Sequence, residues 1–378
     1  MLEVEVIKNE SDFFNLRNSW SKLLKETRLN SIFVTWEWLF IWWKHYGYNK
    51  KLKIIIIKED NKIIGIAPFV LSKNKFLGLI TYSKIEFMGL GEAYSEHLHF
   101  IIKPGKETLV LNSIIYYFKQ NSYKWDIIRL YLDEQSNNIN KIINLFKLNY
   151  YKVVSNISNV CPYIELPECW KLYYSSLSRN MKEHVRRKSN LLNRKFKIKF
   201  TIINDHNLVD KALNILIYLH QKRQKEKGKI GSFSSKQFIN FHKDIFSVFI
   251  SNSWLKFYLL EINNKPVACL YGYRYNHIFY YYQSGFDTNW AKYSVGTVLM
   301  AFCINDAISN KLKIFDLLTG SEIYKYKWTK KDIKVWDIYI YRPSLKNFLF
   351  IYIRNFKERK IIKLIKSYIL NRSLRNIH

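Results

Sequence analysis

The sequence predicts a mixed α/β protein built from two copies of one unit, and three observations support this prediction. The chain has 378 residues, which exceeds the roughly 100–200 residues of a typical single domain, so two domains are expected. Hydrophobic residues make up 48% of the chain, which is enough apolar surface to form folded cores. Finally, one pattern of strands and helices occurs twice along the sequence.

The repeated pattern is clearest in a pair of hairpins. LKIIIIKEDNKIIGIAPFVL, residues 52–71, aligns without a gap with LKFYLLEINNKPVACLYGYR, residues 255–274. Each segment is an apolar run of strand length, then a turn containing Asn-Lys, then a second apolar run, which is typical of a β-hairpin. We therefore expect antiparallel strand pairs at corresponding places in the two halves.

A helix and a strand follow each hairpin. KWDIIRLYLDEQS, from Lys124, parallels KLKIFDLLTGSE, from Lys311, and each contains the apolar run of a buried strand. An amphipathic stretch of helical spacing precedes each strand, over residues 109–118 and 298–308. Both halves thus read helix, hairpin, strand, helix, strand, which predicts two α/β units with mixed sheets. The expected parts are a first unit, a second unit and a basic tail: residues 1–160, 161–343 and 344–378.

A strongly cationic segment, residues 179–199, lies between the two hairpins. It contains nine Lys or Arg and a single acid, Glu183, and its apolar residues recur every three or four positions, as on one face of a helix. An ordinary surface helix would explain this pattern. Alternatively, Arg186 and Arg187 border a site for a phosphate-bearing substrate, because the arginine fork matches phosphate oxygens.

The overall composition is also basic. Lys and Arg number 61 against 30 Asp and Glu, a net charge of +31, and such a surface attracts phosphates, nucleic acid or acidic lipid headgroups. The chain is rich in Lys, Ile and Asn throughout, so a general compositional bias explains part of this charge equally well. The four cysteines show no spacing typical of a zinc site or a disulfide framework, so free thiols and no metal are expected.

The sequence predicts neither export nor membrane insertion. The N-terminus, MLEVEVIKNE, carries alternating acids, and no run reaches the ~18 apolar residues that a membrane span needs. We therefore expect a cytoplasmic protein.

The densest polar cluster of the second half is YYYQSGFDTNWAKYSVGTVLM, residues 280–300. We expect a strand to end at Tyr282, a loop with Gly285 to follow, and a helix to open near Ser294. Backbone amides at a helix start are unpaired donors at the positive end of the dipole, and a glycine there lets a ligand approach closely. This predicts a pyrophosphate cradle at Ser294, Gly296 and Thr297, with a plain N-cap role for Ser294 as the alternative.

A second polar cluster, FDLLTGSEIYKYKW, spans residues 315–328. Asp316 is expected within a strand that Gly320 breaks. The polar residues in and after that strand are candidate catalytic groups: Asp316, Glu322, Tyr324 and Lys325. Acyl transfer needs a proton acceptor and a donor to stabilise the oxyanion, and these side chains can supply both, although surface charges after a strand are common. No His lies beside a Ser or Cys at a triad-like spacing, so direct transfer in a ternary complex is favoured.

Three histidines are candidate functional residues. His220 ends an amphipathic stretch over residues 209–219, and its apolar neighbours favour a packed or capping role. His97 and His99 alternate on an expected strand and so face one way, but two histidines without a third ligand do not predict a metal site.

Taken together, these residues resemble the bacterial GNAT-superfamily group with the BioF2-like acetyltransferase domain, which is related to the Fem-type peptidoglycan aminoacyltransferases. The matching motifs are short and spread along the chain: Phe33, Trp38, Trp42 and Trp43; Ile64–Pro68; His220, Arg223 and Gly228; Tyr282–Asp287; Tyr293, Ser294 and Gly296; Asp316, Gly320, Glu322, Tyr324 and Lys325. The family usually has Pro at the position of Val295, so the loop before Gly296 is less rigid here.

The resemblance implies tandem GNAT-like units that transfer an acyl group from acyl-CoA, acetyl-CoA above all, to an amine or hydroxyl. The implied acceptor is a nucleotide-linked sugar, a polysaccharide precursor or another cell-envelope precursor. The implied CoA-binding residues include those of the Tyr-Gln-Ser motif, Tyr282, Gln283 and Ser284. The implied acceptor-binding residues, besides the two arginines above, are Trp38, His220 and Arg223. The first unit carries Met88–Ala93 but no Tyr-Ser-x-Gly, and so looks like a degenerate copy that helps bind the acceptor.

Two other functions stay open. Aminoacyl-tRNA is the donor of the Fem relatives, and the +31 charge favours it because tRNA phosphates attract Lys and Arg. Fem proteins typically carry a coiled-coil arm, however, and no long heptad run occurs here, so acyl-CoA is preferred and tRNA is expected only in this alternative. A non-catalytic binder of nucleic acid or acidic membrane would use the basic surface alone.

The tail, residues 344–378, combines nine Lys or Arg with apolar residues at helical spacing. It predicts a helix that either packs on the protein or makes peripheral contact with the inner face of an acidic membrane.

Overall fold

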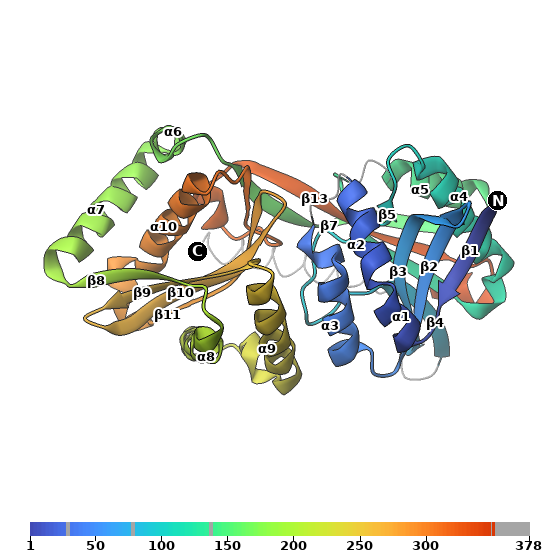
Figure 1. Ribbon diagram of the computed structural model, residues 1–378, viewed down its shortest axis with the longest axis horizontal. Coiled ribbons are helices and arrows are strands. Elements are labelled where there is room, and N and C mark those ends of the chain that lie inside the picture. Colours follow the sequence, from blue (N-terminus) through green and yellow to red (C-terminus); the bar gives the residue numbers. More distant parts are fainter. Residues whose placement is uncertain (28–30, 77–79, 136–138, 349, 352–378) are drawn as a thin grey trace, which may run out of the picture.

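The computed structural model describes residues 1–27, 31–76, 80–135, 139–348 and 350–351. Their strands form one 13-stranded mixed sheet with the order β1-β2-β3-β4-β6-β13-β7-β12-β11-β10-β9-β8, and β5 pairs with β3. Helices cover the sheet to give two lobes (Figure 1). The mixed α/β fold predicted from the sequence is therefore confirmed.

Apart from the short β5, both halves contain the same succession of a strand, helices, three strands, a helix and a strand, from β1 to β6 and from β8 to β12. The first half contains β1 (Leu2–Ile7), α1 (Glu10–Asn15), α2 (Arg17–Glu26), α3 (Trp36–Tyr46), β2 (Lys50–Glu59), β3 (Lys62–Phe76), β4 (Ile80–Phe87), β5 (Ile101–Ile102), α4 (Glu107–Gln120), β6 (Ile127–Asp133), α5 (Ile139–Leu148) and β7 (Lys152–Glu165). The second half contains α6 (Trp170–Ser176), α7 (Arg179–Lys195), β8 (Ile198–Ile203), α8 (Val209–Glu226), α9 (Lys236–Ser251), β9 (Leu255–Ile262), β10 (Lys265–Tyr275), β11 (Ile278–Phe286), α10 (Val295–Ser309), β12 (Ile314–Asp316) and β13 (Lys331–Tyr341).

The two predicted hairpins are β2–β3 and β9–β10. Each turns through two residues with positive φ, Asp60 and Asn61 (49° and 62°) in the first and Asn263 and Asn264 (52° and 60°) in the second. Asn and Asp adopt this left-handed conformation more readily than most residues, which is what a two-residue hairpin turn requires. The same local chemistry thus builds the same turn twice.

The last strand of each half pairs across the boundary between the halves. β13 lies between β6 and β7 and is antiparallel to both, while β7 lies between β13 and β12. The boundary expected at residues 160/161 falls inside β7. The two lobes therefore share one hydrogen-bonded sheet, and long strands run from one lobe into the other (Figure 1).

In the second half, two parallel strands separate and open the sheet. β11 and β12 pair only over residues 278–280 and 314–316. β11 then continues to Phe286 along β10, whereas the chain after β12 follows β7, with the Leu317 amide donating to the Pro162 carbonyl at 2.9 Å. We call the resulting gap, between residues 281–286 and 317–320, the strand opening.

β11 is longer than predicted, since it ends at Phe286 and not at Tyr282. Gly285, expected in a loop, pairs with Cys269 within the sheet. The glycine is needed for close packing: a Cβ there would lie 2.5 Å from the His220 amide nitrogen of α8. A similar correction applies to His97 and His99, which lie in the irregular loop between β4 and β5 and not on a strand.

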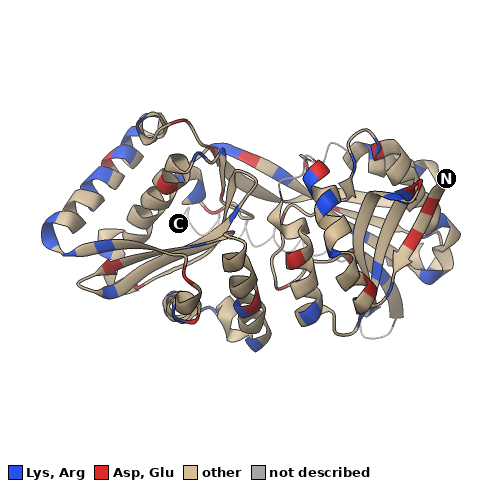
Figure 2. Ribbon diagram, in the orientation of Figure 1, with Lys and Arg blue, Asp and Glu red and all other residues tan. Residues whose placement is uncertain are grey.

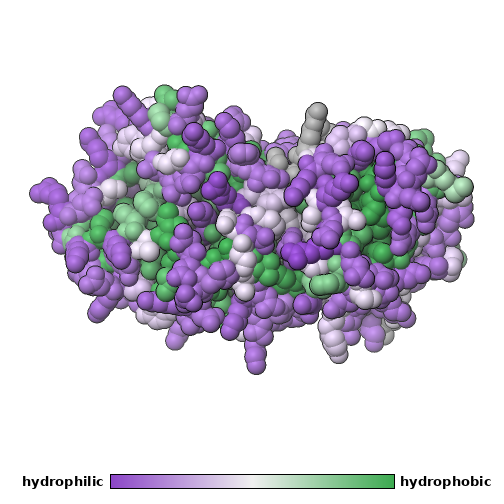
Figure 3. Space-filling model, viewed as in Figure 1, coloured by the Kyte–Doolittle hydropathy of each residue, from purple (hydrophilic) through white to green (hydrophobic). Residues whose placement is uncertain are grey.

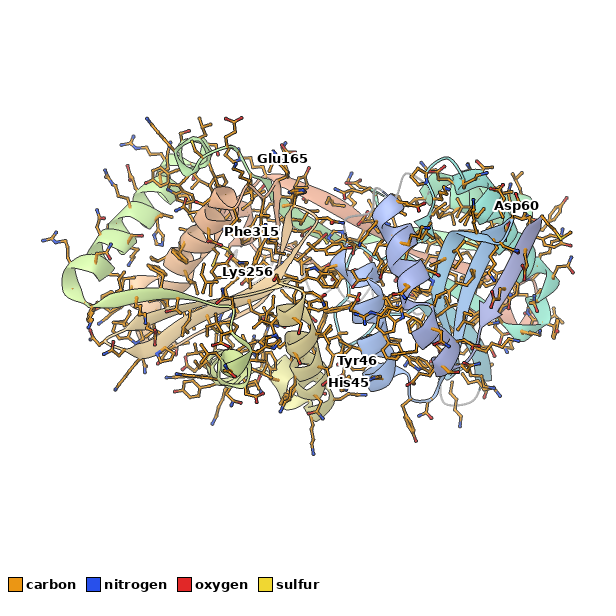
Figure 4. All side chains as sticks on the ribbon, viewed as in Figure 1. His45, Tyr46, Asp60, Glu165, Lys256 and Phe315 are labelled. Carbon is orange, nitrogen blue, oxygen red and sulfur yellow. The ribbon has the colours of Figure 1, made fainter. Side chains whose placement is uncertain are left out.

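The lobes also pack through aromatic side chains of α3 and α9. Trp38 is fully buried there, with its indole donating to Ser95 Oγ at 2.8 Å and its ring centroid 5.1 Å from that of Phe241. At the end of α3, labelled in Figure 4, His45 Nε2 lies 2.8 Å from Asp244 Oδ2 of α9.

The cationic segment is an amphipathic helix, as predicted. α7 buries Met181, Val185 and Leu192, and Ser178 caps its start by accepting from the Met181 amide at 3.3 Å. The helix runs along the outer edge of the second lobe, and its Lys and Arg positions are coloured blue in Figure 2. Hydrophilic residues dominate the face in Figure 3, with apolar patches between them.

Most of the tail, residues 352–378, lies outside the described residues, so the predicted tail helix is not described there. The part before it packs on the first lobe, where Phe350 is buried 4.9 Å from the Tyr82 ring and Lys346 Nζ lies 2.8 Å from Asp126. No helix in the described part of the chain is long and apolar enough to cross a membrane.

Candidate active site

A cavity of about 500 Å³ lies beside the strand opening, and we call it the α10 cavity. Its walls come from α7, α8, β10, β11, the start of α10 and the segment after β12. The lining residues that carry polar chemistry or shape are Arg223, Tyr281, Ser284, Ser294, Gly296, Thr297, Tyr324 and Lys327. Six of the residues predicted for binding and catalysis thus lie around one space: Arg223, Ser284, Ser294, Gly296, Thr297 and Tyr324.

The start of α10 forms one wall. Ser294 sits at the cap position with φ 56°, but its side chain makes no capping hydrogen bond, so the plain N-cap alternative is not observed. The first amides of a helix lack intrahelical partners and lie at the positive end of its dipole. Gly296 has an ordinary φ, and a Cβ there would meet only the Phe286 ring at 3.5 Å. The backbone conformation does not require a glycine at this position. The absence of a side chain nevertheless leaves this wall of the cavity open.

β11 forms a second wall and is irregular at Tyr282. Tyr271 pairs with Gln283 and Gly272 pairs with Tyr281, so Tyr282 is an extra residue that re-aims its neighbours, as in a β-bulge. Tyr281 and Ser284 reach the α10 cavity, with their hydroxyl oxygens 2.6 Å apart.

Tyr282 and Gln283, predicted as CoA-binding residues, do not line the α10 cavity. The Tyr282 ring packs toward the first lobe, 5.8 Å from Trp38, and its hydroxyl donates to the Ala93 carbonyl. The Gln283 side chain accepts from the Ser284 amide at 3.2 Å. Of the three predicted β11 residues, only Ser284 faces this space.

Tyr324 approaches the cavity from the segment after β12. Although 39% of its surface is exposed, its hydroxyl end lies beside Tyr281. Burial of that end, together with the neighbouring Tyr281, raises the pKa of Tyr324 well above its usual value. The hydroxyl is therefore protonated at neutral pH and can donate a hydrogen bond into the cavity.

Cations surround the cavity mouth. The guanidinium carbon of Arg223 lies 4.6 Å from the centre of the Phe286 ring, and its Nε is buried without a hydrogen-bond partner among the described residues. The charge of Arg223 is the largest cause of a lowered pKa at Lys227, and burial followed by Lys188 lowers the pKa of His184. Cations that lower one another's pKa are stabilised by an arriving anion.

Lys325, a predicted catalytic residue, supports the backbone through hydrogen bonds. Its ammonium group is buried and donates to the carbonyls of Leu318 at 3.1 Å and Thr319 at 2.7 Å. Glu322 lies 3.1 Å from it and is more than half exposed. Neither residue lines the α10 cavity, because both side chains are directed to the segment that connects β12 to β13.

The predicted acceptor-binding residues are dispersed. Trp38 belongs to the aromatic core between the lobes. His220 is buried, its ring centroid lies 5.1 Å from that of Phe233, and burial lowers its pKa, so the packed alternative is the observed one. Arg186 and Arg187 are exposed and line a separate concavity of about 690 Å³ with Arg194. This concavity, the α7 groove, shares Asn180 and His184 with the α10 cavity.

A buried polar cluster that the sequence analysis missed lies at the floor of the strand opening. His97 Nδ1 is 2.5 Å from Asp133 Oδ2, and His97 Nε2 is 2.9 Å from Asp316 Oδ2. Burial lowers the pKa of His97, but Asp316 and Asp133 outweigh it and raise this pKa well above its usual value. Asp316, predicted as catalytic, thus pairs with a cationic histidine of the first half. The two predicted histidines were the only signal for this cluster in the sequence, and their partners are remote in the chain.

In the described part of the chain, no group of three or more His, Cys, Asp or Glu side chains is arranged to hold a metal ion. The four cysteines are free.

The chain is similar in sequence to one protein family and in fold to several solved structures. Residues 179–326 match the acetyltransferase (GNAT) domain family. No curated protein matches the chain in a sequence search.

Solved structures resemble the chain over most of its length. FemX has 10% identity and a TM-score of 0.61, with 92% of this chain and 99% of FemX covered. The tandem GNAT protein of the clavulanic acid biosynthesis pathway has 7% identity and a TM-score of 0.50, covering 90% of this chain and all of that one (100%). L-PGS from Bacillus licheniformis has 11% identity and a TM-score of 0.50, with 89% and 96% covered. At these identities the likeness shows a common fold.

Proposed function

We propose that the chain is an acyltransferase whose donor is acyl-CoA, since residues 179–326 match the acetyltransferase (GNAT) domain family. The acceptor would be an amine or hydroxyl of a cell-envelope or polysaccharide precursor. The observation that carries the donor assignment is the unpartnered, buried Nε of Arg223 in a cavity that also contains a helix start.

The α10 cavity fits the parts of acyl-CoA. Its pyrophosphate would lie against the first amides of α10 at Ser294, Gly296 and Thr297, where helix starts favour anions. Arg223 and Lys327 would pair with the phosphate oxygens. The thioester arm would then run past Ser284 toward the strand opening, and the Tyr324 hydroxyl would donate a hydrogen bond to the leaving thiolate.

The α7 groove fits a phosphate-bearing acceptor, such as a nucleotide-linked sugar. Arg186, Arg187 and Arg194 supply exposed guanidinium groups there, and the shared residues Asn180 and His184 connect it to the donor cavity. In the first half, the loop after β4 packs against β6 through the buried His97, which contacts Asp133, so we assign donor binding to the second half and leave the first half a role in acceptor binding. We expect the protein to act in the cytoplasm, with contact at the inner membrane face where envelope precursors are assembled.

Isothermal titration calorimetry with acetyl-CoA would test the donor. We expect Arg223→Met to weaken binding by about tenfold or more, because a charge-assisted hydrogen bond contributes about 1.5–3 kcal/mol. Lys225→Met is the matched control, since Lys225 is an exposed cation on the same helix that does not line the cavity. Equal loss in both variants, or no binding by the wild type at low salt, would refute the assignment.

The exposed cations of the α7 groove also favour a second candidate, an aminoacyl-tRNA donor. It predicts that tRNA binds the wild type, that Arg186→Ala and Arg187→Ala abolish this binding, and that acetyl-CoA does not bind. The GNAT domain match disfavours a non-catalytic binder.

A further inference from the structure

Glu96 is a buried carboxylate that the proposed function leaves without a role. It lies in the loop between β4 and β5 of the first half and is only 6% exposed. Its Oε2 atom has no hydrogen-bond partner among the described residues. A buried, unpaired carboxylate oxygen is unfavourable, and such groups in folded proteins commonly have a functional explanation.

Glu96 lies at the strand opening. The Thr319 hydroxyl, on the arm after β12, hydrogen-bonds its carboxylate, and Tyr282 on β11 is close enough for the two side chains to interact electrostatically. These two residues stand on opposite sides of the opening. The Tyr282 hydroxyl also donates to the carbonyl of Ala93, which fixes the Glu96 loop against β11.

The carboxylate reaches the opening from the side opposite to the donor. Tyr281 faces the α10 cavity and belongs to the core around α10. Tyr280 and Tyr282, its neighbours on β11, face the first lobe and belong to the other core. Glu96 approaches with these two residues, so the sheet separates it from the space assigned to the pyrophosphate.

The surroundings of Glu96 raise the pKa of its carboxyl group to near neutral pH. Burial is the main cause that raises its pKa to about 7, Asp316 raises it further, and the Thr319 hydroxyl, His97 and Lys325 oppose the increase. The other titratable groups that interact with Glu96 are Tyr131, Tyr282 and Cys161, whose own pKa values are raised by burial. A carboxylate of this kind can take up a proton at neutral pH.

We propose that Glu96 accepts the proton of the acceptor during transfer, with the reacting amine or hydroxyl of the acceptor lying in the strand opening. This rests on the proposed function. The acceptor nitrogen attacks the thioester carbonyl, a C–N bond forms and the C–S bond breaks. The proton of the attacking nitrogen goes to the Glu96 carboxylate, and the departing thiolate, which accepts a hydrogen bond from the Tyr324 hydroxyl, takes its proton from solvent. With a hydroxyl acceptor, oxygen replaces nitrogen in the same step.

Glu96→Gln tests this role, because it retains the shape and the contact with Thr319 but cannot take up a proton. With acetyl-CoA and a panel of amino sugars, thiol release should fall by about a hundredfold or more, the range for a lost general base. The rise of the wild-type rate as the pH passes about 7 should disappear. The affinity for acetyl-CoA should stay unchanged.

Glu92→Gln is the matched control, since Glu92 lies in the same loop but is exposed and accepts from Ser235 Oγ at 3.2 Å. If Glu96→Gln does not fold, Glu96→Ala with added formate replaces it, and recovery of turnover by formate would support the role. Turnover of Glu96→Gln within threefold of the wild type, with the same pH profile, would overturn the role of Glu96 alone. Absence of acetyl-CoA binding by the wild type would overturn the proposed function and this role together.

Discussion

Two lysines only two positions apart should respond to substitution in opposite ways. Lys325 is 4% exposed and donates to two backbone carbonyls at 3.1 and 2.7 Å. Lys327 is exposed and lines the α10 cavity. We predict that Lys325→Met destabilises the protein and that Lys327→Met leaves stability unchanged but weakens acetyl-CoA binding.

The size of the first effect follows from the contacts. A hydrogen bond to a charged group contributes about 1.5–3 kcal/mol, and the substitution leaves two carbonyl oxygens without their donor. A loss of about 3 kcal/mol is therefore expected. At roughly 2–4 °C per kcal/mol for a large domain, the Tm should fall by roughly 6–12 °C.

Differential scanning calorimetry of the wild type and both variants would measure this shift, with calorimetric titration of acetyl-CoA alongside. The Tm of Lys327→Met serves as the control for removal of a lysine from the same segment. If Lys325→Met keeps its Tm within about 2 °C and loses turnover, Lys325 acts on the substrate and its assignment to backbone support is refuted.

Two further predictions concern the cavity and the buried carboxylate. Gly296→Glu should abolish acetyl-CoA binding in calorimetry with little change in Tm, because a Cβ there has room but the carboxylate would enter the anion site; retained affinity would contradict the cradle. Glu96 has a folded-state pKa of about 7 against 4.5 in its unperturbed state, so the folded protein binds the extra proton between these values. Stability should therefore fall by about 3 kcal/mol as the pH rises from about 4.5 to about 7, at 1.36 kcal/mol for each pH unit. Urea denaturation across this range should show the decrease in the wild type but not in Glu96→Gln.

Local patterns in the sequence were sufficient for the repeated elements. The Asp-Asn and Asn-Asn turns fix two-residue hairpins through their own backbone preferences, and α7 follows from the spacing of its apolar residues. The cavity residues at the start of α10 were also predictable, because a glycine and a hydroxyl residue at a helix start have meaning without tertiary contacts.

Other features depend on contacts that no local pattern contains. Tyr324 and Lys325 are adjacent in the sequence, yet one faces the cavity and the other the backbone, because the turn after β12 directs them apart. His97 obtains its charge from Asp133 and Asp316, which lie in strands of different halves. Glu96 carried no signal in the sequence at all, since its burial and the unpaired oxygen exist only after the lobes meet.

The pairing of β7 and β13 across the boundary between the halves also affects how the chain folds during synthesis and whether either half can be produced as a separate fragment. The first lobe needs β13 beside β6, and β13 comprises residues 331–341, so the ribosome must deliver nearly the whole chain before that lobe's sheet is complete. Pairing over such sequence distances slows folding and exposes strand edges during translation. Because β7 supplies the partner of β12, a fragment that starts after residue 165 would also leave that strand edge bare. Neither half can therefore be produced alone with a complete set of strand partners.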